Sequence, residues 1–118
     1  CHIWKGNQLF AILGTPGSYG ILQTTAQMIL NLIEHKMNIQ AAIEAPRIRI
    51  EKSGTDVGIE ERISSQTRRE LTTRGHNVRA LPTWTAAVGG GQGITIDQEE
   101  GTFMGGADPR RDGYAIGI

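Results

Sequence analysis

The sequence has few of the features that mark a disulfide scaffold, a membrane protein or a nucleic-acid-binding protein. Its 118 residues include one cysteine, which excludes an internal disulfide and leaves the redox compartment open. No apolar run approaches the roughly 18 residues of a transmembrane helix, and no basic start with a following apolar stretch marks a signal peptide. Twelve basic and twelve acidic residues balance to a formal charge of zero, which argues against a nucleic-acid or anionic-membrane partner.

The chain begins with Cys1 and not with methionine, which predicts a processed chain or a fragment. A signal peptide upstream of such a fragment would be missing from the sequence. Because the sequence has no apolar run of transmembrane length, a soluble chain is expected. Its compartment, cytoplasmic or periplasmic/secreted, stays open. Sixteen glycines are about twice the ordinary usage of roughly 7%, and they predict short strands joined by tight turns.

The most informative stretch joins a predicted strand to a predicted helix. The apolar run Leu9–Leu13 is typical of a strand buried on both faces, and apolar residues at helical spacing predict a helix from Ile21 to about Glu34. The turn Gly14–Gly20 between them contains three glycines and precedes free helical N–H groups, so it can hold an anion or a developing oxyanion. A tight connection without chemistry is the alternative.

Two nucleotide-binding motifs are disfavoured at this turn. A phosphate loop needs a lysine after its last glycine, but here Ser18 is followed by Tyr19 and Gly20, and no lysine follows until Lys36. A dinucleotide-binding fingerprint begins with two glycines separated by one residue, whereas these glycines are three residues apart.

The remaining pattern alternates short helices and strands. Asn38 is placed to cap a helix that ends before Pro46. Ser64 or Ser65 is placed to cap a polar, solvent-exposed helix that reaches Arg74, with Gly75 as the residue directly after it. Further strands are predicted at His2–Trp4, Gln8–Leu13, Arg47–Glu51, Ile59–Arg62, Val78–Leu81, Gly93–Asp97, Thr102–Ala107 and Tyr114–Ile118, with a polar turn at Lys52–Gly58. This order predicts an α+β fold in which helices pack on an antiparallel or mixed sheet, as a single domain of residues 1–118.

Two polar or glycine-rich segments near the C-terminus leave alternatives open. The run Gly89–Gly93 is either an anion-binding nest or a flexible loop. Asp108, Arg110, Arg111 and Asp112 surround Pro109, and they predict either a buried ion network or a simple salt-bridged turn.

Four segments of the chain resemble successive motifs of the gamma-glutamyltransferase family. Their order and approximate spacing agree with those of the family, and the resemblance covers nearly the whole chain. The run Gly105–Ala115 is most similar to the broader gamma-glutamyltransferase-like branch, which includes cephalosporin acylases and other amidohydrolases. The four segments are Gly14-Thr15-Pro16-Gly17-Ser18, Gln23–Gln27, Ile39–Arg47 and Asp108–Tyr114.

The resemblance implies a fold and a chemistry. The fold would be one half of the four-layer αββα sandwich of N-terminal-nucleophile hydrolases, without the large subunit and the first part of the small subunit. In this family a threonine hydroxyl, activated by its own α-amino group, attacks the γ-glutamyl amide, and water, an amino acid or a peptide then accepts the acyl group. The nucleophile would lie upstream of this chain, whose partners would be the rest of the enzyme and a γ-glutamyl or related amide substrate. Neither a cofactor nor a metal is implied.

The family places two consecutive glycines after the loop proline, and their backbone N–H groups stabilise the oxyanion. The matching positions are Gly17 and Ser18, which are the predicted catalytic and substrate-binding residues. Ser18 departs from the family, and its N–H can serve only if its Cβ tolerates the backbone conformation. An amidohydrolase or acylase acting on another amide, and a non-catalytic structural or partner-binding domain, are the alternatives.

Two expectations concern the chain by itself. It should be inactive and should associate with itself or with its missing part, because it contains an oxyanion loop without the nucleophile and half of a sandwich. A competing hypothesis makes Cys1 an N-terminal nucleophile, because an α-amino group titrates near neutral pH and can take the thiol proton. The resemblance instead places Cys1 in a strand just ahead of the glycine loop, well downstream of the family's threonine.

Overall fold

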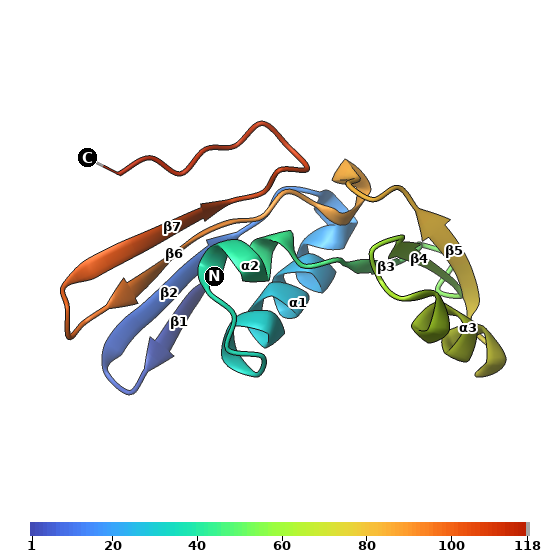
Figure 1. Cartoon of the computed structure of the whole chain (residues 1–118), viewed down its shortest axis with the longest axis horizontal. Helices are drawn as coiled ribbons and strands as arrows, with labels where there is room; N and C mark the ends of the chain where they lie inside the picture. Colours follow the sequence, from blue (N-terminus) through green and yellow to red (C-terminus); the bar gives the residue numbers. More distant parts are fainter. Residues whose placement is uncertain (118) are drawn as a thin grey trace.

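The chain forms two β-sheets that lie at opposite ends of an elongated molecule of 47 × 30 × 24 Å (Figure 1). The structure is a computed structural model and describes residues 1–117. A four-stranded sheet with two helices fills one end, and a three-stranded sheet with one helix fills the other. This arrangement confirms the predicted α+β class.

The larger sheet has the strand order β1-β2-β6-β7 and is antiparallel throughout. All four strands lie where the sequence predicts them, within one or two residues at each end. Its two hairpins turn at Gly6 and Gly101, and both residues have positive φ, at 61° and 65°. The strands are β1 (His2–Lys5), β2 (Gln8–Gly14), β6 (Gln92–Asp97) and β7 (Thr102–Ala107).

Helices α1 (Ile21–Ile33) and α2 (Ile39–Glu44) cover one face of this sheet. The predicted N-cap of α2 is confirmed, because the Asn38 side chain accepts a hydrogen bond from the Ala41 N–H at 2.8 Å. Apolar side chains from β2 and from both helices form the core of this half: Ala11, Leu13, Met28, Leu32, Ile39, Ala42 and Ile43.

Helix α1 is buried on one side only. The sequence predicts a helix enclosed within the layers, but Leu22 is 82% exposed and Leu30 is 52% exposed in the chain by itself. The helix therefore packs its inner face on β2, and its outer face carries apolar side chains that no described residue covers.

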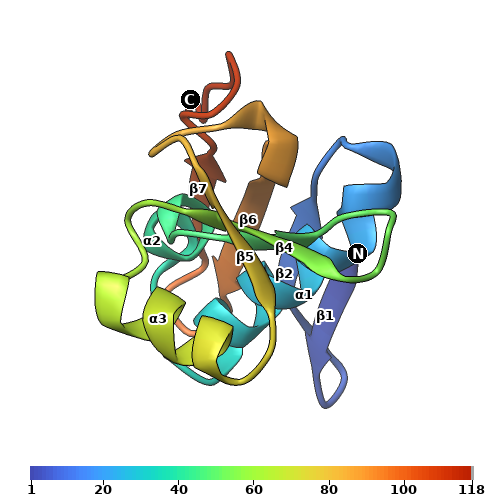
Figure 2. The same cartoon turned by 90° about the vertical axis from the view of Figure 1, so that its right-hand side faces the viewer.

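The smaller sheet consists of β3 (Ile48–Ile50), β4 (Asp56–Glu60) and β5 (Asn77–Leu81), and helix α3 (Ser65–Thr73) connects the parallel strands β4 and β5 (Figure 2). The predicted caps of α3 are confirmed, because Ser64 Oγ accepts from the Thr67 N–H at 3.0 Å and Gly75 has a φ of 94°. None of the residues of α3 is buried, which confirms a solvated helix.

One turn prediction and two strand predictions are wrong in part. Lys52–Gly58 is not a turn throughout, because β4 begins at Asp56 and buries Val57 between β3 and β5. Arg47–Glu51 does contain strand β3, but its burial does not alternate as predicted, because Arg47 is fully buried while Ile50 is 39% exposed. Residues 114–117 form no strand: a Cβ on Gly105 would lie 3.0 Å from the Ala115 Cβ, so this segment packs over β7. Ile118, the end of that predicted strand, lies outside the described residues.

Candidate functional site

The β2–α1 loop, residues Thr15–Gly20, brings the two predicted site residues to the end of strand β2. Gly17 has φ 139° and ψ 19°, a conformation that only glycine adopts readily, and Ser18 follows with φ 51°. A short 3-10 helix, η1 (Ser18–Gly20), then leads into α1. Two successive residues with positive φ reverse the direction of the backbone here, which explains why a glycine is required at the first position.

This backbone leaves N–H donors free. The Gly20 N–H bonds to the Gly17 carbonyl at 3.0 Å, whereas the N–H groups of Gly17 and Ser18 donate to no acceptor within residues 1–117. Ser18 is exposed and Gly17 is half-buried. Two neighbouring donors at the surface in front of a helix N-terminus can bind an anion or a carbonyl oxygen that gains negative charge.

A second segment, the turn of residues 85–91, supports the loop from behind. The Gly90 N–H donates to Thr15 Oγ1 at 3.0 Å, and a Cβ on Gly17 would lie 3.8 Å from the Gly89 Cα. Residues 88–91 are buried, so the flexible-loop interpretation of Gly89–Gly93 is wrong for this part. The Gly91 N–H does bind an anion, but that anion is the internal carboxylate of Asp108, at 2.7 Å.

A buried ion cluster lies beneath this turn. Asp108 contacts Arg47 at 2.8 Å and Arg110 at 3.0 Å, and Arg110 also binds Glu60 at 2.6 Å; all four side chains are at most 1% exposed. Of the two alternatives for this turn, the buried network holds for Asp108 and Arg110, whereas Arg111 and Asp112 are exposed. The cluster connects β4 of the small sheet to the end of β7 in the large sheet.

The environment of the cluster shifts its ionisation equilibria. Burial lowers the pKa of Arg47, and the nearby Arg110 lowers it further. Burial alone would raise the pKa of Asp108, but backbone N–H donors from Arg110 and Gly91 and the charges of both arginines hold it below its ordinary value. Burial likewise opposes the charge of Arg110, but its bond to Glu60 and the charge of Asp108 raise its pKa. Asp108 is therefore held as a carboxylate.

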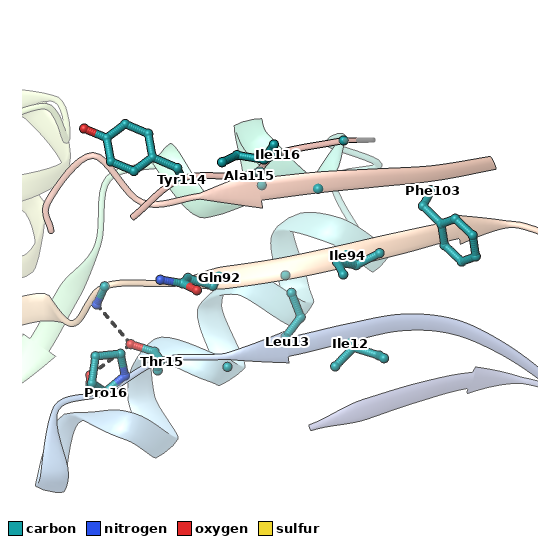
Figure 3. Close-up of a pocket in the computed structure, with 16 residues that line it drawn as sticks. Ile12, Leu13, Thr15, Pro16, Gln92, Ile94, Phe103, Tyr114, Ala115 and Ile116 are labelled. Carbon is teal, nitrogen blue, oxygen red and sulfur yellow. Dashed lines mark hydrogen bonds between the residues drawn. The ribbon is translucent and has the colours of Figure 1, made fainter. Parts of the chain in front are cut away.

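An open hollow of about 840 Å³ begins beside the loop and follows the face of the sheet opposite the helices (Figure 3). Thr15 and Pro16 form one end, Ile94 and Phe103 form the floor, and residues 114–117 lie along one side. Gly17 and Ser18 do not line this hollow. The two predicted donors therefore lie next to an apolar depression on the uncovered face of the sheet, but not inside it.

Neither a metal-binding cluster nor a membrane-spanning helix is present in the part of the chain that the structure describes. No group of three or more His, Cys, Asp or Glu side chains is arranged to hold a metal ion. Residues 1–117 also contain no helix with the length and apolar character needed to span a membrane.

Helices on one face of an antiparallel sheet, an open apolar face on the other and a glycine loop at the strand end define one half of an N-terminal-nucleophile hydrolase sandwich. The sequence profile described as gamma-glutamyltranspeptidase matches residues 1–118, and the chain belongs to that family.

Its relatives include two kinds of proenzyme. The chain is 37% identical over 114 residues to the acylase ACY 1 proenzyme of Pseudomonas sp. (strain V22), covering 97% of the chain and 19% of the relative. It is 35% identical over 116 residues to the glutathione hydrolase proenzyme of Bacillus subtilis (strain 168), covering 98% of the chain and 19% of the relative. The chain thus spans about a fifth of the length of these relatives.

Solved structures agree with the fold. A cephalosporin acylase from Bacillus halodurans superposes with a TM-score of 0.86 and 32% identity, covering 93% of this chain and 20% of that one. An acivicin-inhibited gamma-glutamyltranspeptidase superposes with a TM-score of 0.83 and 29% identity, covering 95% of this chain and 59% of that one.

Sequence reasoning missed Arg47 and Glu60 as members of the cluster and Thr15 as a contact of the 85–91 turn. The signal for Arg47 was an arginine directly after Pro46, in a segment that the resemblance had already singled out. Glu60 offered only a carboxylate among apolar residues of a strand. For Thr15, whose partner Gly90 lies 75 residues away, no local signal exists.

Proposed function

We propose that this chain forms the C-terminal part of a gamma-glutamyltransferase-like enzyme that transfers or hydrolyses a γ-glutamyl acyl group. In this proposal the N–H groups of Gly17 and Ser18 form the oxyanion hole. The observation that carries it is the pair of positive φ values at Gly17 and Ser18, which leaves two adjacent N–H donors without an internal acceptor. The glutathione hydrolase proenzyme at 35% identity supports the substrate class.

The proposed reaction has two similar steps. A threonine upstream of this chain gives its hydroxyl proton to its own α-amino group, and its oxygen bonds to the amide carbon of the substrate. The carbonyl oxygen becomes an oxyanion, which Gly17 and Ser18 bind, and the C–N bond then breaks as the amine leaves with the proton. Water, an amino acid or a peptide next attacks the ester and gives a proton to the α-amino group, which forms a second oxyanion at the same donors. The ester C–O bond then breaks, and the threonine oxygen takes that proton from the α-amino group as it leaves.

Ser18 fits this role at a cost. Its φ of 51° shows that a serine adopts the left-handed conformation required after Gly17, although such a conformation is roughly 1–2 kcal/mol less favourable for a residue with a Cβ. Its N–H is therefore retained as a donor, while its exposed side chain adds a hydroxyl beside the site. Ser18→Gly should relieve strain and keep the donor.

A second candidate function is the hydrolysis of another amide. The acylase ACY 1 proenzyme is 37% identical to this chain, which is as close as the glutathione hydrolase relative. Comparing a γ-glutamyl anilide with an acyl anilide that lacks the α-amino and α-carboxyl groups of glutamate separates the two. A non-catalytic structural or partner-binding role is the third candidate, and it predicts turnover of neither anilide.

Gly17→Val tests the oxyanion assignment in the full-length protein that contains this chain. Valine cannot readily adopt φ 139°, so the Gly17–Ser18 peptide should turn away from the oxyanion. Losing one donor of this kind typically lowers the acylation rate by about 10² to 10³ without weakening substrate binding. Single-turnover acylation with a γ-glutamyl anilide measures the effect, with circular dichroism to verify folding.

The matched controls lie in the same loop. Ser18→Gly and Tyr19→Phe keep both N–H donors and should acylate at rates near that of the parent. If Gly17→Val is folded and acylates at the parental rate, the β2–α1 loop only connects the strand to the helix and the oxyanion assignment is wrong. The 118-residue chain by itself should turn over no anilide; turnover that disappears in Cys1→Ser would instead support Cys1 as the nucleophile.

A further inference from the structure

The turn of residues 85–91, which supports the β2–α1 loop, is fixed through its main chain. The three residues of its 3-10 helix, η2 (Ala86–Val88), have carbonyl groups that each accept a hydrogen bond from an arginine. The bonds run from Arg111 Nη2 to Ala86 O at 3.3 Å, from Arg49 Nη1 to Ala87 O, and from Arg47 Nη1 to Val88 O at 3.2 Å. Three cationic donors on three successive carbonyls hold this turn in one place.

The Thr15 hydroxyl connects the 85–91 turn to the β2–α1 loop by two hydrogen bonds. Thr15 Oγ1 accepts the Gly90 N–H at 3.0 Å and donates to the Pro16 carbonyl at 3.0 Å, as the dashed lines in Figure 3 show. These two bonds use the hydroxyl as acceptor and as donor at once, which fixes the orientation of the side chain.

The hydrogen bond to the Pro16 carbonyl links Thr15 to one of the two proposed oxyanion donors. The Pro16 carbonyl belongs to the same planar peptide unit as the Gly17 N–H, and in a trans peptide the two groups point in opposite directions. A bond that holds the Pro16 oxygen therefore sets the direction in which the Gly17 N–H points.

The contact between the 85–91 turn and the β2–α1 loop requires a glycine at position 89 of the turn. Gly89 has a φ of 93°, and a Cβ there would lie 2.6 Å from Thr15 Oγ1 and 3.2 Å from Thr24 Oγ1. No side chain fits between the turn and Thr15 without moving one of them. The close approach is thus built into the backbone of the 85–91 turn.

We infer that Thr15 is a positioning residue, whose hydroxyl uses the turn fixed by three arginines to aim the Gly17 N–H at the oxyanion. This inference rests on the proposed function, since it needs Gly17 to be an oxyanion donor. Thr15 touches neither substrate nor reacting atoms in this role. It acts through the Pro16–Gly17 peptide.

Thr15→Val in the full-length protein tests the inference, because valine keeps the shape of threonine and removes the hydroxyl. The acylation rate of a γ-glutamyl anilide should fall about tenfold, less than the 10² to 10³ typical of a lost donor, because the Gly17 N–H remains but is misaligned. The substrate concentration that gives half-maximal acylation should not change. Thr15→Ser keeps the hydroxyl and should restore the parental rate, and Thr15→Ala should behave like Thr15→Val.

The controls separate this inference from the proposed function. Thr72→Val removes a hydroxyl that bonds only to its own helix, at Arg68 O, and should acylate like the parent. If Gly17→Val is slow and Thr15→Val is not, the positioning role is refuted and the oxyanion hole stands. The positioning role is equally refuted if Thr15→Ser acylates as slowly as Thr15→Val. It is also refuted if Thr15→Val changes only the substrate concentration that gives half-maximal acylation. Parental rates in both Gly17→Val and Thr15→Val would refute the oxyanion hole as well.

Discussion

Asp108 is the residue at which the contacts of the buried ion cluster converge. Its Oδ2 binds Arg47 at 2.8 Å and accepts the Gly91 N–H at 2.7 Å, while its Oδ1 accepts the Arg110 backbone N–H and guanidinium, both at 3.0 Å. Removing this one carboxylate would leave buried arginine charge without its partner. Asp108→Asn should therefore destabilise the fold by about 3–5 kcal/mol near pH 7.

The pH dependence of stability follows from the lowered pKa of Asp108. A carboxyl whose pKa is lower in the folded than in the unfolded state stabilises the fold fully above the unfolded pKa, and this contribution is lost as pH falls through the folded pKa. Asp108 should contribute unchanged from about pH 7 to pH 5, and its contribution should decline below about pH 4. The free-energy difference between the parent and Asp108→Asn should shrink over the same range.

Urea unfolding at several pH values, followed by tryptophan fluorescence, measures this difference, since the Arg110 guanidinium lies 4.9 Å from the ring of Trp84. Exposed Asp112 supplies the control, because Asp112→Asn should change the free energy of unfolding by less than about 0.5 kcal/mol. A parent-to-Asp108→Asn difference that stays constant from pH 7 to pH 3 would contradict the assignment.

Single residues could be predicted from the sequence where the signal was local. Asn38 and Ser64 were identified as caps because a cap and its N–H donor lie within three residues of each other. Asp108 and Arg110 were identified because charges surround a proline in one turn. Arg47 and Glu60 were missed as their partners because the contacts span 61 and 50 residues, and no local pattern encodes such pairs.

At the scale of elements, helix side chains take the place of a neighbouring strand. Gln23 and Gln27, one turn apart on α1, each accept a backbone N–H of β3 and donate to the carbonyl of the same residue. The residues paired in this way are Ile50 and Ile48, whose N–H groups lie 2.7 and 2.8 Å from the amide oxygens. The same pattern occurs between Gln40 of α2 and Ala107 of β7. Glutamine amides thus attach helices to strands through backbone groups.

Gln27→Met should loosen the attachment of the small sheet. Methionine matches glutamine in length but offers no amide, so the part-buried Ile48 N–H and carbonyl would lose their partners, at a cost of about 1–3 kcal/mol. Gln66→Met on exposed α3 is the matched control and should cost less than about 0.5 kcal/mol. Chemical denaturation of the two variants compares them, and equal stabilities would rule out a structural role for the Gln27 amide.

The elements that the sequence did not predict correctly have weak local patterns. Strand β4 is central in its sheet, but its apolar residues Val57 and Ile59 are separated by Gly58 and preceded by polar turn residues. The alternation at Tyr114–Ile118 is that of a strand, yet residues 114–117 pack over β7 without joining the sheet. In both cases tertiary contacts decided the conformation against the local pattern.

At the scale of the whole molecule, the large sheet has helices on one face, whereas within residues 1–117 only the extended segment 114–117 packs on the other face. Ile94 and Phe103 on that face are 43% and 72% exposed, and Tyr114 and Ile116 beside them exceed 80%. An apolar surface of this kind favours association. We therefore expect the isolated 118-residue chain to self-associate, or to bind the remaining part of the enzyme proposed above.

Phe103→Ser tests which surface drives the association. It should shift the sedimentation coefficient of the isolated chain toward that of the monomer at a given concentration. Met104→Ser is the matched control, since neighbouring strand residues point to opposite faces of the sheet, and it should shift the distribution less. A parental chain that sediments as a monomer at all concentrations and unfolds cooperatively would contradict the expectation.

The glutamines of α1 also restrict how whole molecules can meet. An unpaired strand edge is a template on which another chain can add its own strand, the first step toward fibres and swapped dimers. On the side of β3 away from β4, the N–H and carbonyl groups of residues 48 and 50 are already bonded to glutamine side-chain amides of α1. These amides belong to a helix, so no further strand can pair beyond them. The small sheet therefore terminates at β3, and copies of this chain that meet there find no backbone groups left to pair with.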